Sequence, residues 1–110
     1  MKNINVIYDY EYDYETDILT VADDVDIISV PDFVCEHLEE IVQKFFDWAK
    51  ETKDHGYWEW NEEGKYFALA LGTKEFLKWL NINYYSCENK ESVLIEEHTK
   101  YRPELPCAEF

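Results

Sequence analysis

Tyrosines and acids alternate strictly near the start of this chain. Residues 8–15 read YDYEYDYE, so one tyrosine separates each acid from the next. Because a β-strand places successive side chains on opposite faces, the pattern predicts a strand over residues 3–13 with a packing face and an acidic face. The acidic row comprises Asp9, Glu11, Asp13 and Glu15.

Neighbouring acids in such a row lie roughly 6.6 Å apart along a strand, so they repel one another and oppose folding. Two interpretations follow. The row can be a solvated outer face whose charge discourages edge-to-edge pairing of sheets, or it can be an anionic binding surface. The density of acids without an intervening lysine favours the binding surface.

The charge balance of the chain points the same way. It has 25 acids and 10 bases, a formal net charge of −15, and residues 1–36 hold ten of the acids but only one base, Lys2. This charge repels nucleic acids and anionic membranes. It attracts a basic protein partner and makes the association fast and salt-sensitive.

The composition is that of a folded chain, since 46% of residues are hydrophobic and 17% aromatic. We expect residues 1–110 to form one domain. The N-terminal segment lacks the apolar stretch of a signal peptide, and no run is apolar enough for a membrane span. Three irregularly spaced cysteines do not suggest a disulfide framework, so we expect reduced thiols in the cytoplasm.

The rest of the sequence predicts an α+β fold, with an antiparallel or mixed sheet, one long and one short amphipathic helix. Strands are predicted at residues 17–21, 26–30 and 92–98, followed by an extended tail. The long helix is expected over residues 33–51 with Asp32 as its N-cap, and the short helix is expected to be capped by Thr73. Residues 57–71 predict a hairpin whose second arm is apolar on both faces and therefore central in a sheet.

No segment carries a recognised catalytic or metal-binding motif, and we expect neither enzyme activity nor a cofactor. Three weak alternatives remain open. Cys35 and His37 are spaced too closely to share a helix face, which disfavours a nucleophilic pair. A metal could bind Cys87, His98 and Cys107. The turn containing Asp23, Asp24 and Asp26 could hold a hard cation, although a solvated turn is favoured.

Two groups of tryptophans are distinguished by their spacing. Trp48 and Trp79 fall on the apolar stripes of the helices, which predicts that they belong to the core. Trp58 and Trp60 alternate in the first hairpin arm and share one face; uncovered, that face would be an aromatic binding patch. The adjoining turn carries Glu62 and Glu63, so we include all four among the candidate partner-binding residues.

In its size, acidity, abundance of tyrosine and tryptophan and lack of catalytic motifs, the chain resembles bacterial immunity proteins of contact-dependent and colicin-type toxin systems. The resemblance implies that it binds a cognate basic toxin, expected to be a nuclease, and covers its active site or a neighbouring exosite. One alternative is a phage-type DNA mimic that inhibits a restriction or CRISPR nuclease. A second alternative is a small hydrolase or metal-dependent enzyme.

Overall fold

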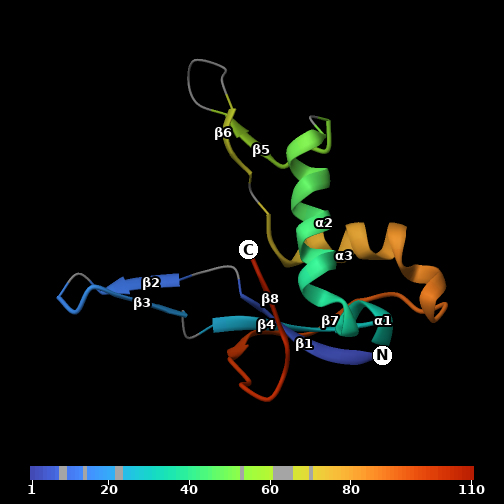
Figure 1. The fold of residues 1–110 in the computed structure, drawn as a ribbon, viewed down its shortest axis with the longest axis horizontal. Helices are drawn as coiled ribbons and strands as arrows, with labels where there is room; N and C mark the ends of the chain where they lie inside the picture. The colour runs from blue at the N-terminus through green and yellow to red at the C-terminus, as the bar shows by residue number, and fades with distance from the viewer. Residues whose placement is uncertain (8–9, 14, 22–23, 53, 61–65, 70) are drawn as a thin grey trace.

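The computed structural model describes residues 1–7, 10–13, 15–21, 24–52, 54–60, 66–69 and 71–110, with only the backbone for residues 10–13, 18–21, 59–60 and 66–69 (Figure 1). In chain order the strands are β1 (Lys2–Ile7), β2 (Tyr10–Asp13), β3 (Ile18–Val21), β4 (Asp24–Val30), β5 (Trp58–Trp60), β6 (Tyr66–Leu69), β7 (Val93–Lys100) and β8 (Cys107–Glu109). The helices are α1 (Asp32–Glu36), α2 (Leu38–Glu51) and α3 (Thr73–Asn83), and a short 3-10 helix spans Tyr85–Cys87.

Four of these strands form a mixed sheet in the order β7-β4-β1-β8. β4 is antiparallel to both β1 and β7, whereas β8 is parallel to β1. Two further antiparallel pairs, β2-β3 and β5-β6, form separate ribbons that extend away from this sheet in Figure 1. The arrangement confirms the predicted α+β class, with α2 as the long helix and α3 as the shorter one.

The main core lies between the sheet and the helices. Ile4, Val6 and Ile28 face buried helix residues, and the aromatic rings of Phe45 and Phe76 lie 5.2 Å apart within this layer. The predicted helix stripes are largely confirmed. Trp79 is buried, and Trp48 is half-buried against the core.

A buried asparagine fastens the C-terminal segment to the central strand. The side-chain amide of Asn5 donates hydrogen bonds to the carbonyl oxygens of Arg102 (2.8 Å) and Leu105 (3.2 Å), while its oxygen accepts one from the backbone N–H of Arg102 (3.1 Å). Asn5 is fully buried, so these bonds replace the water that its amide loses on folding. Residues 102–107 are thereby held along the sheet and lead directly into β8.

The C-terminal segment closes both faces of the sheet. Leu105 packs on Ile7 and Ile27 on the face opposite the helices. Beyond β8, the ring of Phe110 meets those of Phe45 and Phe76 edge-on, at 5.6 Å and 5.1 Å. The tail, expected only to be extended, therefore supplies a strand and an aromatic core residue.

A second contact joins the start of β1 to the first helix. The Met1 ammonium lies 3.0 Å from carboxylate oxygens of both Asp32 and Glu88. The hydrogen bond to Asp32 raises the pKa of the ammonium, and that to Glu88 adds to the effect. The same ammonium lowers the pKa of the Asp32 carboxyl.

The strand predicted over residues 3–13 is wrong as a single element. β1 and β2 belong to different sheets, and residues 8–9 between them lie outside the described residues. Asn5 and Ile7, which share the predicted acidic face, are buried because β1 is an interior strand covered on both sides. The regular spacing of residue types in the sequence therefore gives no sign that β1 pairs with β4 whereas β2 pairs with β3.

Other element boundaries also differ from expectation. The long helix is two helices separated at His37, with α1 packing on β1 and α2 on β8. The cap positions are Pro31 and Gly72, and the predicted caps Asp32 and Thr73 are instead the first helical residues. Strand β6 pairs only with β5 in a two-stranded ribbon, so its expected central position is wrong among the described strands.

Replacing Asn5 tests how much the fold depends on its hydrogen bonds. We expect Asn5→Ala to lower the free energy of unfolding by about 3 kcal/mol, because it leaves buried backbone groups unpaired. Asn3→Ala is the matched control: Asn3 is exposed on the same strand, and its loss should change stability by less than about 0.5 kcal/mol. Urea denaturation measures both, and equal midpoints for the two variants would contradict the assignment.

Candidate protein-partner interface

The β2-β3 ribbon carries most of the predicted acidic row. Glu11 lies opposite Thr20 in the ribbon and Asp13 lies opposite Ile18. Glu15 follows in the turn and is exposed. Asp9 lies outside the described residues. The ribbon therefore places three of the four row positions on an extension of the molecule, away from the helices (Figure 1).

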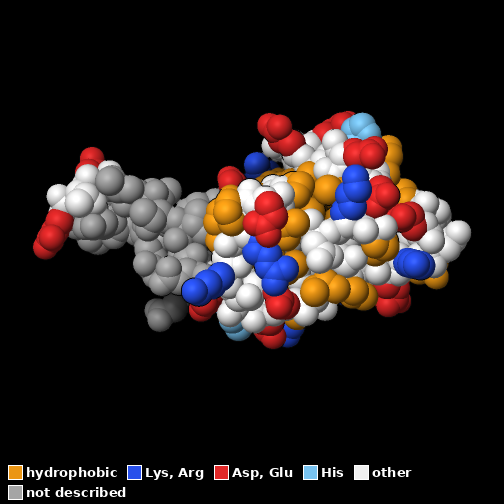
Figure 2. Space-filling model, turned by 90° about the horizontal axis from the view of Figure 1, so that it is seen from below, with side chains coloured by type: hydrophobic (Ala, Val, Ile, Leu, Met, Phe, Trp, Pro, Cys, Tyr) orange, Lys and Arg blue, Asp and Glu red, His pale blue; other side chains and the backbone are white. Residues whose placement is uncertain are grey.

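The charge at the tip of this ribbon differs from the charge of the body. Its described turn holds Glu15 and Asp17, both exposed, with Thr16 between them. Figure 2 shows acidic side chains at this tip, whereas lysines and arginines are interspersed with acids over the visible face of the body. A basic partner that approaches the ribbon tip therefore meets two exposed acids in one turn.

In the second predicted patch, in the β5-β6 ribbon, the described side chain of Trp58 is less exposed than on a free aromatic face. Trp58 is half-buried, and its indole N–H donates a 2.9 Å hydrogen bond to the carbonyl of Thr52. Trp60 pairs in register with Tyr66. Glu62 and Glu63 lie outside the described residues. Trp58 therefore has a structural role in anchoring β5 to the end of α2.

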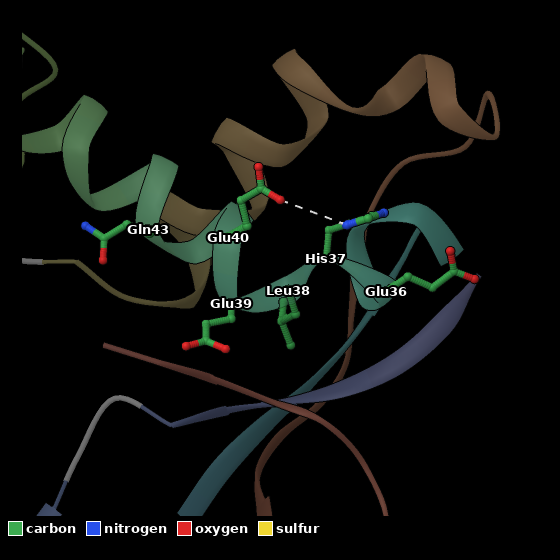
Figure 3. Close-up of a pocket in the computed structure, with 6 residues that line it drawn as sticks. All are labelled: Glu36, His37, Leu38, Glu39, Glu40 and Gln43. Carbon is green, nitrogen blue, oxygen red and sulfur yellow. Dashed lines mark ion pairs between the residues drawn. The ribbon is translucent and has the colours of Figure 1, made fainter.

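A further acidic surface lies at the junction of α1 and α2. It comprises Glu36, Glu39 and Glu40, which line a shallow pocket of about 470 Å³ together with His37, Leu38 and Gln43 (Figure 3). Glu40 lies 4.0 Å from the His37 ring and 3.6 Å from the Lys44 ammonium. We call Glu36, Glu39 and Glu40 the helical acidic surface.

This surface continues toward β8. A neighbouring pocket of about 400 Å³ is lined by Glu39 and Gln43 of α2, by the apolar Val42 and Phe46, and by Cys107 and Glu109 of β8. The sequence gives no sign that Glu39 lies close to a residue of β8. The proximity of Glu39 to Glu109 depends on the parallel pairing of β8 with β1, for which the three residues of β8 give little signal.

Strand β7 presents apolar side chains at the edge of the sheet. Val93, Leu94 and Ile95 are 43%, 42% and 48% exposed, although they are consecutive and so belong to both faces. In the described sheet, β7 pairs only with β4. An edge of this kind can accept an extended chain, so the molecule offers apolar as well as acidic contacts.

Asp26, one of the acids considered for a cation, is committed to the fold. It is buried in β4, where one carboxylate oxygen accepts a 2.5 Å hydrogen bond from the Thr73 hydroxyl and the other a 3.1 Å bond from the backbone N–H of His98. Asp24 is exposed, and Asp23 lies outside the described residues. Asp26 thus joins β4, β7 and the first turn of α3.

Among the described residues, the groups that could support catalysis or metal binding are dispersed over the molecule. Cys35, Cys87 and Cys107 are free thiols, and among the described residues no cluster of three or more histidine, cysteine or acidic side chains has the geometry to hold a metal. Within the same residues, no helix is long and apolar enough to cross a membrane.

Comparison with known proteins gives no match to this chain, either among family models, among curated proteins or among solved structures. The interpretation of its surfaces therefore depends on their charge, exposure and geometry.

The role of Asp26 can be tested against its exposed neighbour. We expect Asp26→Ala to lower the free energy of unfolding by about 2–4 kcal/mol, since the buried Thr73 hydroxyl and the backbone N–H of His98 lose their acceptor. Asp24→Ala, two residues earlier on the same strand, should change it by less than about 0.5 kcal/mol. Chemical denaturation of both variants is the measurement, and an Asp26→Ala protein as stable as wild type would refute the structural role.

Proposed function

We propose that this protein is an immunity protein that binds a basic toxin domain, expected to be a nuclease, in the cytoplasm and neutralises it. The observation that carries the proposal is the net charge of −15 together with exposed acids at the tip of the β2-β3 ribbon. In this proposal the protein acts by binding, without catalysis or a cofactor.

The proposed mechanism uses carboxylates in place of phosphates. A nuclease holds its substrate backbone with lysine and arginine side chains, and those cations bind carboxylates by the same charge-assisted hydrogen bonds. The ribbon projects from the body, so it can enter a groove that the wider sheet and helices cannot. Asp9, Glu11, Asp13 and Glu15 would occupy the groove and exclude the nucleic acid.

The helical acidic surface and the apolar edge would extend the contact. Apolar side chains of α2 are surrounded by the acids Glu36, Glu39 and Glu109. Protein interfaces commonly have this arrangement, with an apolar centre and a polar rim. Long-range attraction would mainly raise the association rate, whereas close contacts would set the dissociation rate. Trp58 and Trp60, with Glu62 and Glu63, form the secondary contact region in this proposal.

Co-expression with a toxin tests the function directly. We expect the protein to restore growth of cells that express the toxin domain encoded beside its gene, and the purified pair to form a stoichiometric complex without toxin activity. Failure to bind or protect against that toxin would contradict the proposal. Inhibition of a restriction or CRISPR nuclease instead would identify a DNA mimic.

Two variants of equal net charge distinguish direct binding by the ribbon acids from attraction by the overall charge of the protein. Variant one changes Asp9, Glu11, Asp13 and Glu15 to Asn or Gln; variant two changes the exposed Glu51, Glu91, Glu97 and Glu104 to Gln. We expect variant one to weaken toxin binding by several kcal/mol, because close charge pairs at such interfaces contribute about 1.5–7 kcal/mol each. Variant two should mainly slow association, by about tenfold or less at low salt.

Surface plasmon resonance over a range of NaCl concentrations measures both effects. Equal affinities for the two variants would show that only net charge matters and that the ribbon is not the recognition surface. An association rate of the wild-type protein that does not change with salt would exclude electrostatic steering.

A further inference from the structure

A pocket walled by aromatic rings lies where the end of α2 and the segment leading into β5 face α3. Its volume is about 350 Å³, within the range of small-ligand sites. Trp48, His55 and Tyr57 form one side, and Trp79 and Ile82 of α3 contribute to the other. Ile82 is 73% exposed, so the pocket has an apolar rim open to solvent.

His55 serves this pocket as a flat wall. Its Nδ1 accepts a 3.0 Å hydrogen bond from the backbone N–H of Tyr57, so Nε2 carries the proton and donates a 2.8 Å bond to the carbonyl of Ala49. The ring stacks on Tyr57 with centroids 4.7 Å apart and planes 19° apart, and it lies 5.1 Å from the ring of Trp48. With both nitrogens engaged and its ring stacked on Tyr57, the imidazole contributes ring surface rather than a hydrogen bond to the pocket.

The rim carries one charge of each sign. Asp54, in the segment after α2, and Lys78, on α3, are both exposed and both line the pocket. The faces of tryptophan and tyrosine attract cations, and the net charge of −15 raises the local concentration of cations around the whole molecule. A ligand that stacks on the aromatic side while reaching Asp54 would use both attractions.

We infer that this pocket binds an arginine side chain of a protein partner. A guanidinium group is planar, stacks on aromatic rings and pairs with a carboxylate through two parallel hydrogen bonds. A lysine ammonium can pair with Asp54 but cannot stack. The inference deepens the proposed function and rests on it for the source of the arginine, because a basic toxin domain supplies such side chains.

The pocket can be tested without any toxin. The probe is N-acetyl-L-arginine amide, and its control is the uncharged analogue N-acetyl-L-citrulline amide, both followed by two-dimensional NMR of the isotope-labelled protein. We expect the arginine compound to shift the indole N–H signals of Trp48 and Trp79 and the amide of Tyr57, with millimolar affinity, and the citrulline compound to bind at least about threefold more weakly.

Two rim variants test whether Asp54 attracts the cationic probe and Lys78 repels it. We expect Asp54→Asn to weaken binding of the arginine probe by about two- to fivefold and Lys78→Gln to strengthen it by a similar factor. Glu51→Gln and Lys74→Gln are the matched controls, since both residues are exposed nearby on α2 and α3 but do not line the pocket. Each control should leave the affinity for the arginine probe at the wild-type value.

The outcomes distinguish failure of the arginine pocket from failure of the proposed immunity function. Equal binding of the two probes, shifts spread over the surface, or rim variants with the reverse effects (tighter binding by Asp54→Asn and weaker binding by Lys78→Gln) would overturn the arginine pocket. Toxin neutralisation unaffected by Asp54→Asn, with no localised probe binding, would refute the pocket and leave the immunity function standing. Localised arginine binding in a protein that neutralises no toxin would support the pocket and refute the function.

Discussion

The hydrogen bonds of Asn5 determine how the rest of the structure is completed. They hold residues 102–107 against the central strand, so that β8 pairs with β1 in parallel and Phe110 reaches the rings of Phe45 and Phe76. Leu105 covers the second face of the sheet through the same segment. One buried amide thus connects the first strand of the chain to its last ten residues.

The sequence predicted the elements whose apolar residues recur at regular spacing. The helix stripes around Phe45 and Phe76, the strand around Ile27 and Ile28, and the α+β class follow from periodicity because burial of one face imposes it. The burial of Asn5 was not predictable, since a lone polar residue on the acidic face of a predicted strand gives no sign that a distant carbonyl will pair with it. Likewise, β8 has only three residues, which are too few for an alternation of apolar and polar side chains to be recognised.

The candidate site could be predicted only in part. Alternating acids indicated a charged strand, and the ribbon β2-β3 places Glu11 and Asp13 on a strand of this kind. The separation of β2 from β1 was not predictable, because the alternation of side chains is the same whichever strand is the partner. The helical acidic surface and the aromatic pocket bring together residues from distant segments, such as Glu39 with Glu109 and Trp48 with Trp79, so they require the tertiary structure.

These features describe a body held together by aromatic packing and buried amide or carboxylate contacts, with excess negative charge at its periphery. Bases of the body, such as Lys44, pair with some acids, whereas the alternating row contains no base within residues 8–15. Charge of this kind opposes folding by self-repulsion and favours association with a cation-rich surface. We therefore propose that the acids of the alternating row, unlike the buried Asp26, reduce stability and serve the binding of a partner.

The dependence of folding stability on salt tests this claim most directly. The free energy of unfolding would be measured by urea denaturation between about 10 mM and 0.5 M NaCl, a range over which the Debye length falls from about 30 Å to a few ångströms. We expect stability to rise with salt, most steeply at the lowest concentrations, and neutralising Glu11, Asp13 and Glu15 to reduce this rise. Stability that is constant or falls with added salt would contradict the claim, because it would mean that the acids are already compensated in the folded protein.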